Sequence, residues 1–370
     1  MKYYRLTNIM KKAPKAQYYM VFGERSNGKT YSVIELGLKN FLSTGKQFAI
    51  VRRWKEDIVG KNGASMLNNL VLNEKGVNTV KKLTKGKYDN IVYRSRRWYL
   101  AYYDSDLDRM VLNEKPIAYA FAITDYEHDK SSSYPEITTI LFDEFMTKGN
   151  YLPDEFIFFQ QVISTIVRGR DNVTVFMCAN TVSMYNPYFS EMGLIHARQM
   201  KPGDIEIYKY GDSKLEVAVE YSDSPNKAGK PSDVYFAFNN PKLKMITNGL
   251  WQIDIYPHIQ ANFEKKHILF TYFVVFEEYI LQCEIVSKDN LLFTYVHVKT
   301  TPIKDNTKDI IYQLQPVEER NYYTNLLYPC DDLSKKITYF YKANKVFYQS
   351  NDIGEVMNNY LNQCKKSIMK

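Results

Sequence analysis

The sequence predicts an α/β fold with a largely parallel sheet over residues 1–222, followed by a smaller α+β region. Two observations lead to this prediction. In the first region, short apolar runs alternate with amphipathic stretches of helix length, and such runs are typical of buried parallel strands covered by helices on both faces. Near the end of the chain, three closely spaced strand-like runs within 267–299 predict an antiparallel meander.

The elements of the first region follow one another in a regular order. We expect strands at 17–23, 46–54, 115–124, 137–145 and 172–180, and amphipathic helices at 29–43 and 155–170. Residues 203–222 predict a two-stranded hairpin. The richest cluster of turn-forming residues follows at 223–233, so we place a domain boundary there. A helix with one apolar face, 352–369, closes the chain and is expected to dock on the second sheet.

The composition is that of a folded chain with room for two domains. The 370 residues are 45% hydrophobic and 15% aromatic, with only 13 Pro and 16 Gly, which excludes a disordered or repetitive chain. The net charge of +8 is compatible with a polyanionic partner. The four cysteines lie far apart, which favours a reducing compartment and argues against zinc or disulfide modules. We expect neither a signal peptide nor a membrane span.

Residues 23–30, GERSNGKT, match the P-loop pattern G-x-x-x-x-G-K-[ST]. The pattern lies between an expected strand and an expected helix, where backbone N–H groups and the helix N-terminus bind phosphates. Lys29 is expected on the β- and γ-phosphates, and Thr30 is expected to reach Mg²⁺. A glycine-rich turn at a strand end is the structural alternative. The remaining nucleotide-binding candidates of this loop are Gly23, Glu24, Arg25, Ser26, Asn27 and Gly28.

A second motif, TTILFDEF, ends an apolar strand in two acids. A carboxylate at the end of a buried strand beside the P-loop can provide the second Mg²⁺ contact, so Asp143 is the candidate Walker B acid. Glu144 is the candidate base that polarises the attacking water. An exposed acid pair at a strand end is the alternative. The long separation of the two motifs predicts intervening strands, and it favours the P-loop NTPase type with an additional central strand and a catalytic glutamate.

Three further polar residues follow the second motif. Asn180 ends the strand at 172–180 and is a candidate sensor of the attacking water or γ-phosphate, although an asparagine also suits a turn. Arg168 and Arg170 end the helix at 155–170 and could supply an arginine finger to a neighbouring subunit. Arginine is also favoured at helix C-termini for structural reasons. The five histidines form no triad with Ser or Cys, so nucleophilic hydrolase chemistry has no support.

The chain resembles a known family in the order and spacing of five segments. The segments are VFGERSNGKTYS, QFAIVRRWK, KSSSYPEITTILFDEF, TIVRGRDNVTVFMCAN and VSMYNPYF. Over residues 18–222 they resemble the DNA-packaging motor ATPases (encapsidation proteins) of phi29-like phages. The resemblance implies a homopentameric ring in the host cytoplasm, attached to the portal, or connector, of a procapsid, in many members through a structural packaging RNA. Such a ring translocates double-stranded DNA by hydrolysing ATP with Mg²⁺.

The resemblance also implies roles for individual residues. Lys29 and Thr30 match the Walker A residues, Asp143 and Glu144 match the Walker B acid and catalytic glutamate, and Arg168 matches a trans-acting arginine finger. Arg170 matches a neighbouring basic residue with a less defined role, and Lys130 matches a second trans-acting cation. Arg53 and Lys55 match basic residues near the nucleotide or the DNA channel. Lys148 matches a loop lysine that faces the DNA.

For the rest of the chain, the resemblance implies a small helical linker domain at 223–262 and an RNase H-like domain at 263–370 that is a vestigial nuclease. Nucleases of this type need carboxylates that converge on two Mg²⁺ ions, with an Asp in the first strand. The expected first strand, HILFTYFVV, contains no acid. We therefore expect no DNA cleavage.

Two other functions remain open at this stage. A P-loop helicase or recombination ATPase would use the same motifs on DNA. A nucleotide-gated scaffold would bind ATP without turning it over, although Glu144 argues against this function because a glutamate at this position serves hydrolysis.

Overall fold

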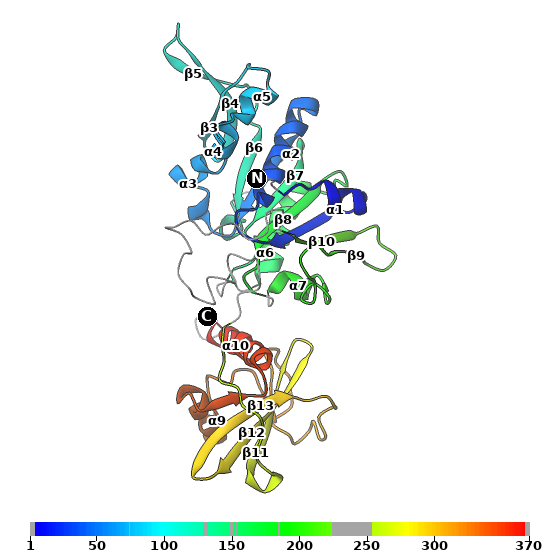
Figure 1. The fold of residues 1–370 in the computed structure, drawn as a ribbon, viewed down its shortest axis with the longest axis vertical. Coiled ribbons are helices and arrows are strands. Elements are labelled where there is room, and N and C mark those ends of the chain that lie inside the picture. Colours follow the sequence, from blue (N-terminus) through cyan, green and yellow to red (C-terminus); the bar gives the residue numbers. More distant parts are fainter. Residues whose placement is uncertain are drawn as a thin grey trace. The chain divides into compact units, whose positions relative to one another are not determined.

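The computed structural model describes residues 4–73, 75–128, 132–147, 151–152, 154–183, 186–223 and 254–366. The chain divides into two compact units, Met1–Gln252 and Ile253–Lys370. Each unit has its own sheet (Figure 1). Among the described residues, none of the helices combines the length and the apolar character needed to cross a membrane.

The first unit is built on a mixed sheet with a parallel centre. In spatial order, the six parallel strands are β6 (Ala118–Ala122), β2 (Gln47–Arg52), β7 (Ile137–Asp143), β8 (Thr174–Asn180), β1 (Tyr18–Gly23) and β10 (Glu216–Ser222). The predicted hairpin at 203–222 is present, with β9 (Ile205–Lys209) antiparallel to β10 at one edge. The expected α/β fold is therefore confirmed.

Strand β8 lies between the P-loop strand β1 and the Walker B strand β7, as the additional-strand prediction requires. The three strands are parallel and in register at their carboxyl ends, where Gly23 is opposite Asn180 and Asp143 is opposite Cys178. The ends of parallel strands meet at one edge of a sheet. This register brings the two predicted motifs and Asn180 to that edge.

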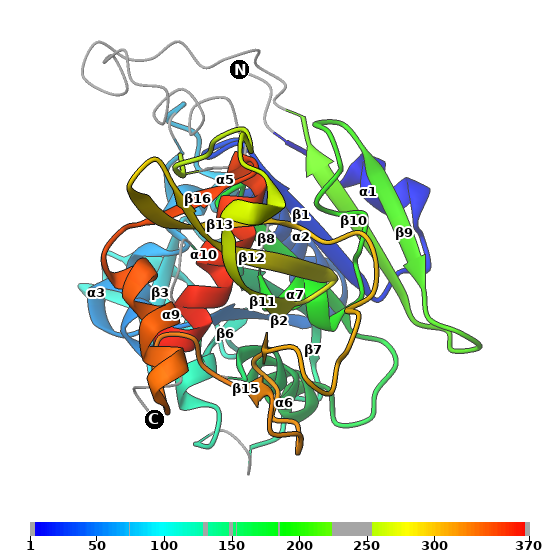
Figure 2. The same ribbon diagram turned by 90° about the horizontal axis from the view of Figure 1, so that it is seen from below.

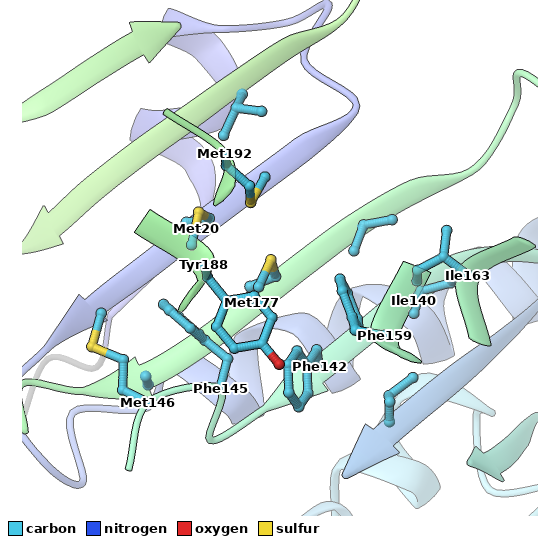
Figure 3. Packing of buried hydrophobic residues seen from close by; sticks show 14 of the residues in the cluster. Met20, Ile140, Phe142, Phe145, Met146, Phe159, Ile163, Met177, Tyr188 and Met192 are labelled. Atoms are coloured by element: carbon cyan, nitrogen blue, oxygen red, sulfur yellow. The ribbon is translucent and has the colours of Figure 1, made fainter. Parts of the chain in front are cut away.

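Helices cover both faces of this sheet, as the strand alternation requires. On one face, α6 (Glu155–Val167) packs through Phe159 and Ile163 against β7 and β1, within a core rich in aromatic residues and methionines (Figure 3). On the other face, α2 (Lys29–Thr44) packs through Val33 and Leu38. Short helices complete the unit: α1 (Thr7–Lys12), α3 (Gly60–Ser65), α4 (Asn68–Val71), α5 (Thr79–Leu83) and α7 (Pro187–Glu191). Helix α1 packs against β10 (Figure 2).

One part of the first unit was not expected from the sequence. Residues between β2 and β6 form the helices α3 to α5 and three antiparallel strands, β3 (Asn90–Arg94), β4 (Arg97–Asp104) and β5 (Arg109–Leu112). Strand β4 extends the main sheet by pairing with β6. Trp98 anchors this insertion, because its ring is fully buried and its indole N–H donates to the Gly63 carbonyl at 3.1 Å.

The second unit contains the predicted meander. Strands β11 (Ile268–Phe276), β12 (Tyr279–Lys288) and β13 (Leu291–Val298) are antiparallel neighbours. Three short strands extend this sheet: β14 (Ile311–Tyr312) beside β11, β15 (Tyr322–Tyr323) beside β14, and β16 (Val346–Tyr348) beside β13. The unit also contains α9 (Asp332–Lys342) and α10 (Asn351–Lys366). The predicted closing helix is present as α10, and it packs on β13 and β16.

The predicted linker domain, 223–262, falls mainly on 224–253, which lie outside the described residues, so it stays a prediction. Residues 254–262 bond to the second unit: Asn351 donates to the Asp254 carbonyl at 2.9 Å, and the Tyr256 N–H donates to Asn351 at 2.8 Å. All four cysteines are described, and no disulfide joins them.

Candidate nucleotide-binding site

An open cavity of about 330 Å³ lies at the carboxyl ends of β1, β7 and β8. It combines the P-loop, the two Walker B acids and the end of β8, with a contribution from α4 and the residues that follow it. Its lining residues are Arg25, Ser26, Asn27, Gly28, Lys29, Thr30, Tyr31, Asn69, Asn73, Asp143, Glu144, Ala179 and Asn180. The structure therefore brings together the predicted Walker A, Walker B and sensor residues.

The backbone of the loop is shaped to bind an anion. Gly28 has a φ of 96° and precedes the first turn of α2, whose N-terminus has no side-chain cap. The first N–H groups of that helix therefore have no helical partners, and that of Lys29 donates to Asn27 Oδ1 at 3.3 Å. Gly23 has a φ of 151°, and a Cβ there would lie 2.3 Å from Ser222 Oγ. Glycine is required at this position, because β10 occupies the space of a side chain.

Lys29 is buried and bonded to its own loop. Its Nζ donates to the Glu24 carbonyl at 2.6 Å and to Asn27 Oδ1 at 3.1 Å. Burial lowers the pKa of the Lys29 ammonium to about 8, although Asp143 and Glu24 oppose this shift. Because burial disfavours the charged form of Lys29, a polyanion would stabilise it. Phosphate oxygens would then replace the two neutral acceptors.

Thr30 and Asp143 form the oxygen pair that the sequence predicts. The Thr30 hydroxyl donates to Asp143 Oδ1 at 2.6 Å, although the two residues come from α2 and β7. Burial raises the pKa of Asp143, and the nearby Arg52 guanidinium opposes that shift. A hydroxyl and a carboxylate are hard oxygen donors of the kind that Mg²⁺ prefers. The pair therefore fits a magnesium ion.

Arg52, the last residue of β2, was not among the predicted site residues, and it holds both acids. Its Nη1 lies 2.8 Å from Asp143 Oδ2, and its Nη2 lies 2.7 Å from Glu144 Oε2. Glu144 adopts a φ of 59°, and its N–H donates to the Cys178 carbonyl at 2.8 Å. The Glu144 side chain is 56% exposed and lines the cavity. Glu144, the candidate base, is therefore paired with Arg52.

Arg53 is placed away from the cavity, so its prediction as a nucleotide ligand is wrong. Its guanidinium pairs with Glu155, which is 1% exposed, at 2.9 Å. It also donates to the Glu144 and Phe145 carbonyls at 3.2 and 2.7 Å. Successive residues of a strand point to opposite faces, so Arg52 reaches the acids while Arg53 enters the core near α6. Arg53 fixes the backbone of the Walker B segment instead.

Lys55 and Arg170 likewise do not line the cavity of their own chain, so they are not nucleotide ligands there. Lys55 pairs with the buried Asp125 at 3.0 Å. The Arg170 guanidinium donates to five backbone carbonyls at 2.7–3.1 Å, those of residues 134, 135, 137, 166 and 167. Arg170 therefore ties the start of β7 to the end of α6.

Arg168 ends α6 in the left-handed conformation, with a φ of 45°. It is exposed and does not line the cavity of its own chain, a position that leaves a role in a neighbouring subunit as a prediction. Lys130 and Lys148, the predicted second cation and DNA-facing lysine, lie outside the described residues. Within the described ranges of both units, no group of three or more His, Cys, Asp or Glu side chains is arranged to hold a metal ion.

We predict that anion binding at the loop takes up a proton at Lys29. With a pKa of about 8, Lys29 is half deprotonated at pH 8 before an anion binds. Because phosphate selects the ammonium form, affinity for tripolyphosphate should fall about tenfold from pH 7 to pH 9 through this group. Calorimetry in buffers of different ionisation enthalpy should show an uptake of about half a proton at pH 8. Lys29→Met is the control, and an equal uptake by that variant would contradict the assignment.

We also predict that Arg53 stabilises the first unit. Arg53→Ala leaves the Glu155 carboxylate buried without its cation, which should lower the free energy of unfolding by about 3–5 kcal/mol in urea denaturation. Lys46→Ala is the control, because it breaks an ion pair with Glu136 whose two side chains are 38% and 47% exposed, and it should cost no more than about 1 kcal/mol. If the Arg53 variant kept its stability but bound phosphate ligands more weakly, the prediction would be contradicted and Arg53 would again be a candidate ligand.

Comparison with known proteins agrees with this geometry. Residues 2–201 match the family described as Podovirus DNA encapsidation protein (Gp16). The DNA packaging protein of Bacillus phage phi29 is 27% identical over 179 residues, and that of Bacillus phage B103 is 28% identical over 178 residues. Each alignment covers 47% of this chain and 46% or 47% of the relative, so the chain spans about half the length of the curated relatives it matches.

Two solved structures share the fold over the whole length. The bacteriophage Phi-29 viral genome packaging motor assembly has a TM-score of 0.60 at 19% identity, with 100% of both chains covered. The Phi-28 gp11 DNA packaging motor has a TM-score of 0.54 at 16% identity, with 98% of each chain covered. Since the family match covers more than half of the residues, the chain belongs to the Podovirus DNA encapsidation protein family.

Proposed function

We propose that the chain binds ATP in the cavity and hydrolyses it. The observation that carries this proposal is the convergence on one cavity of Lys29 and Thr30, at the start of α2, with Asp143 and Glu144, at the end of β7 and directly after it. The N–H groups of the loop and Lys29 would hold the phosphates. Thr30 and Asp143 would hold Mg²⁺, which when bound neutralises charge on the phosphate oxygens.

Glu144 and Asn180 are proposed to act on the attacking water. Both line the cavity. A glutamate carboxylate can accept the proton of a water as it attacks, and an asparagine amide can orient that water by hydrogen bonds. Arg52 now neutralises Glu144 at 2.7 Å. For Glu144 to accept a proton from the attacking water, Arg52 would have to give up this contact.

We propose further that ATP hydrolysis drives double-stranded DNA into a procapsid. Support comes from the family and from the curated relatives of phages phi29 and B103, which are DNA packaging proteins. The proposal includes a ring of subunits, a pentamer, at the portal, attached to it through a packaging RNA. In this ring Arg168 would serve the nucleotide of a neighbouring subunit, and Lys130 and Lys148 keep their predicted roles. The absence of nuclease activity from the second unit also stays a prediction.

We predict that Glu144→Gln keeps nucleotide binding and loses hydrolysis. The amide retains the size of the side chain but cannot accept a proton, so DNA-stimulated turnover should fall by at least about a hundredfold. The measurement is phosphate release with and without double-stranded DNA and procapsids, beside equilibrium binding of a fluorescent ATP analogue. Glu56→Gln, at an exposed glutamate, is the control. Normal hydrolysis by Glu144→Gln would remove Glu144 from the mechanism.

We predict that Arg168→Ala subunits lower the packaging activity of mixed rings out of proportion to their number. If each Arg168 serves the next subunit, one defective subunit interrupts the site of its neighbour, and packaging should fall faster than the fraction of mutant subunits rises. The measurement is DNA packaged per procapsid across a series of mixing ratios. A strictly proportional loss would contradict action between subunits.

A further inference from the structure

Strand β10 holds the P-loop through Ser222, a residue that none of the known motifs includes. Ser222 is 2% exposed. Its Oγ accepts a hydrogen bond from Asn27 Nδ2 at 3.0 Å and donates one to the Phe22 carbonyl at 3.0 Å. The same Oγ occupies the space that a side chain at Gly23 would need. One serine on β10 therefore contacts both the start and the middle of the loop.

A second connection joins β10 to the same asparagine. Glu220 lies two residues before Ser222, on the same face of the strand. Its carboxylate accepts a hydrogen bond from the Tyr4 hydroxyl at 2.5 Å. The Tyr4 N–H donates to the Asn27 carbonyl at 2.8 Å, and the Tyr4 carbonyl accepts from Ser32 Oγ at 2.6 Å. Strand β10 thus holds the side chain of Asn27 directly and its backbone through Tyr4.

The other end of the Asn27 amide contacts the P-loop lysine. Asn27 is 7% exposed, and its Oδ1 accepts hydrogen bonds from Lys29 Nζ at 3.1 Å and from the Lys29 N–H at 3.3 Å. Because Nδ2 is held by Ser222, the amide cannot rotate without losing that buried bond. Its orientation keeps the carbonyl oxygen toward Lys29. A buried chain of hydrogen bonds therefore runs from β10 through Asn27 to the ammonium that would bind phosphate.

We propose that Ser222 and Asn27 are positioning residues that set the shape of the P-loop, so that β10 and the phosphate site respond to each other. The inference rests on the proposed binding of nucleotide. Phosphate draws Lys29 Nζ away from Asn27 Oδ1, which changes the hydrogen bonding of the amide that Ser222 holds. In the reverse direction, a displacement of Ser222 reorients Asn27 and disturbs the loop. Strand β10 is the last strand that the structure describes in the first unit.

The test is a double-mutant cycle on the full chain with a fluorescent ATP analogue. Ser222→Ala removes both buried hydrogen bonds of the Ser222 hydroxyl, so affinity should fall about five- to tenfold. Asn27→Ala should also weaken binding, and the two losses should not multiply, since both variants break the same bond. In turnover assays Ser222→Ala should raise KM by a similar factor and change kcat by less than twofold. Ser213→Ala is the matched control, because this exposed serine in the β9–β10 turn bonds only within its own hairpin.

The outcomes separate the inference from the proposed function. Failure of the unaltered chain to bind the analogue would overturn the proposed function. Normal binding by the unaltered chain and by Ser222→Ala would overturn only the inference. Losses that multiply in the double variant would also overturn it, because Ser222 would then act on packing alone. Should Ser222→Ala fail to fold, Ser222→Cys, whose thiol is a weaker hydrogen-bond partner at the same position, should weaken binding more in the original chain than in the Asn27→Ala background, and equal losses in both would count against the inference.

Discussion

The parallel register of β1, β8 and β7 is the constraint on which the rest of the structure depends. It places Gly23 opposite Asn180 and Asp143 opposite Cys178, so three motifs that are far apart in the sequence end at one edge. The register is fixed by burial on both faces, since Met20 and Phe22 face the core around α6 while Tyr19 and Val21 face the core around α2. A slip by one residue would exchange these faces and separate the motifs. The site is therefore a consequence of core packing.

Within the site, charges are balanced in pairs that a polyphosphate would have to rearrange. Arg52 neutralises Asp143 and Glu144, and Lys29 is bonded to neutral oxygens of its own loop. Both cations, Arg52 and Lys29, are buried or half-buried. Burial disfavours a charged group, and it lowers the pKa of Lys29. Binding of a phosphate chain would stabilise the charged form of Lys29, whereas catalysis would require Glu144 to separate from Arg52. Affinity and turnover consequently depend on different pairs.

The sequence was sufficient for the central strands, both long helices and the cavity residues of the two motifs, because apolar periodicity and motif spacing are local properties. It was not sufficient for the cations. Arg52 and Arg53 are adjacent, and only the pleat decides which of them reaches the acids. Arg170 was predicted to bind the nucleotide, but its guanidinium donates to five backbone carbonyls near the start of β7 and the C-terminal end of α6. The insertion with β3 to β5 was also missed, since its short half-buried strands show little periodicity.

The pairing of β1 with β10 has a consequence for how the chain acquires this site. Asn27 and Ser222 are 195 positions apart, and Gly23 meets Asn180 only after β8 has been made. Contacts of such long sequence separation form slowly, because loop closure precedes any gain from pairing. During synthesis β1 therefore stays without its two sheet neighbours until β8, which ends at Asn180, and then β10, which ends at Ser222, have left the ribosome. The strand that carries the P-loop thus completes its pairing only after the other strands of the parallel centre have been made.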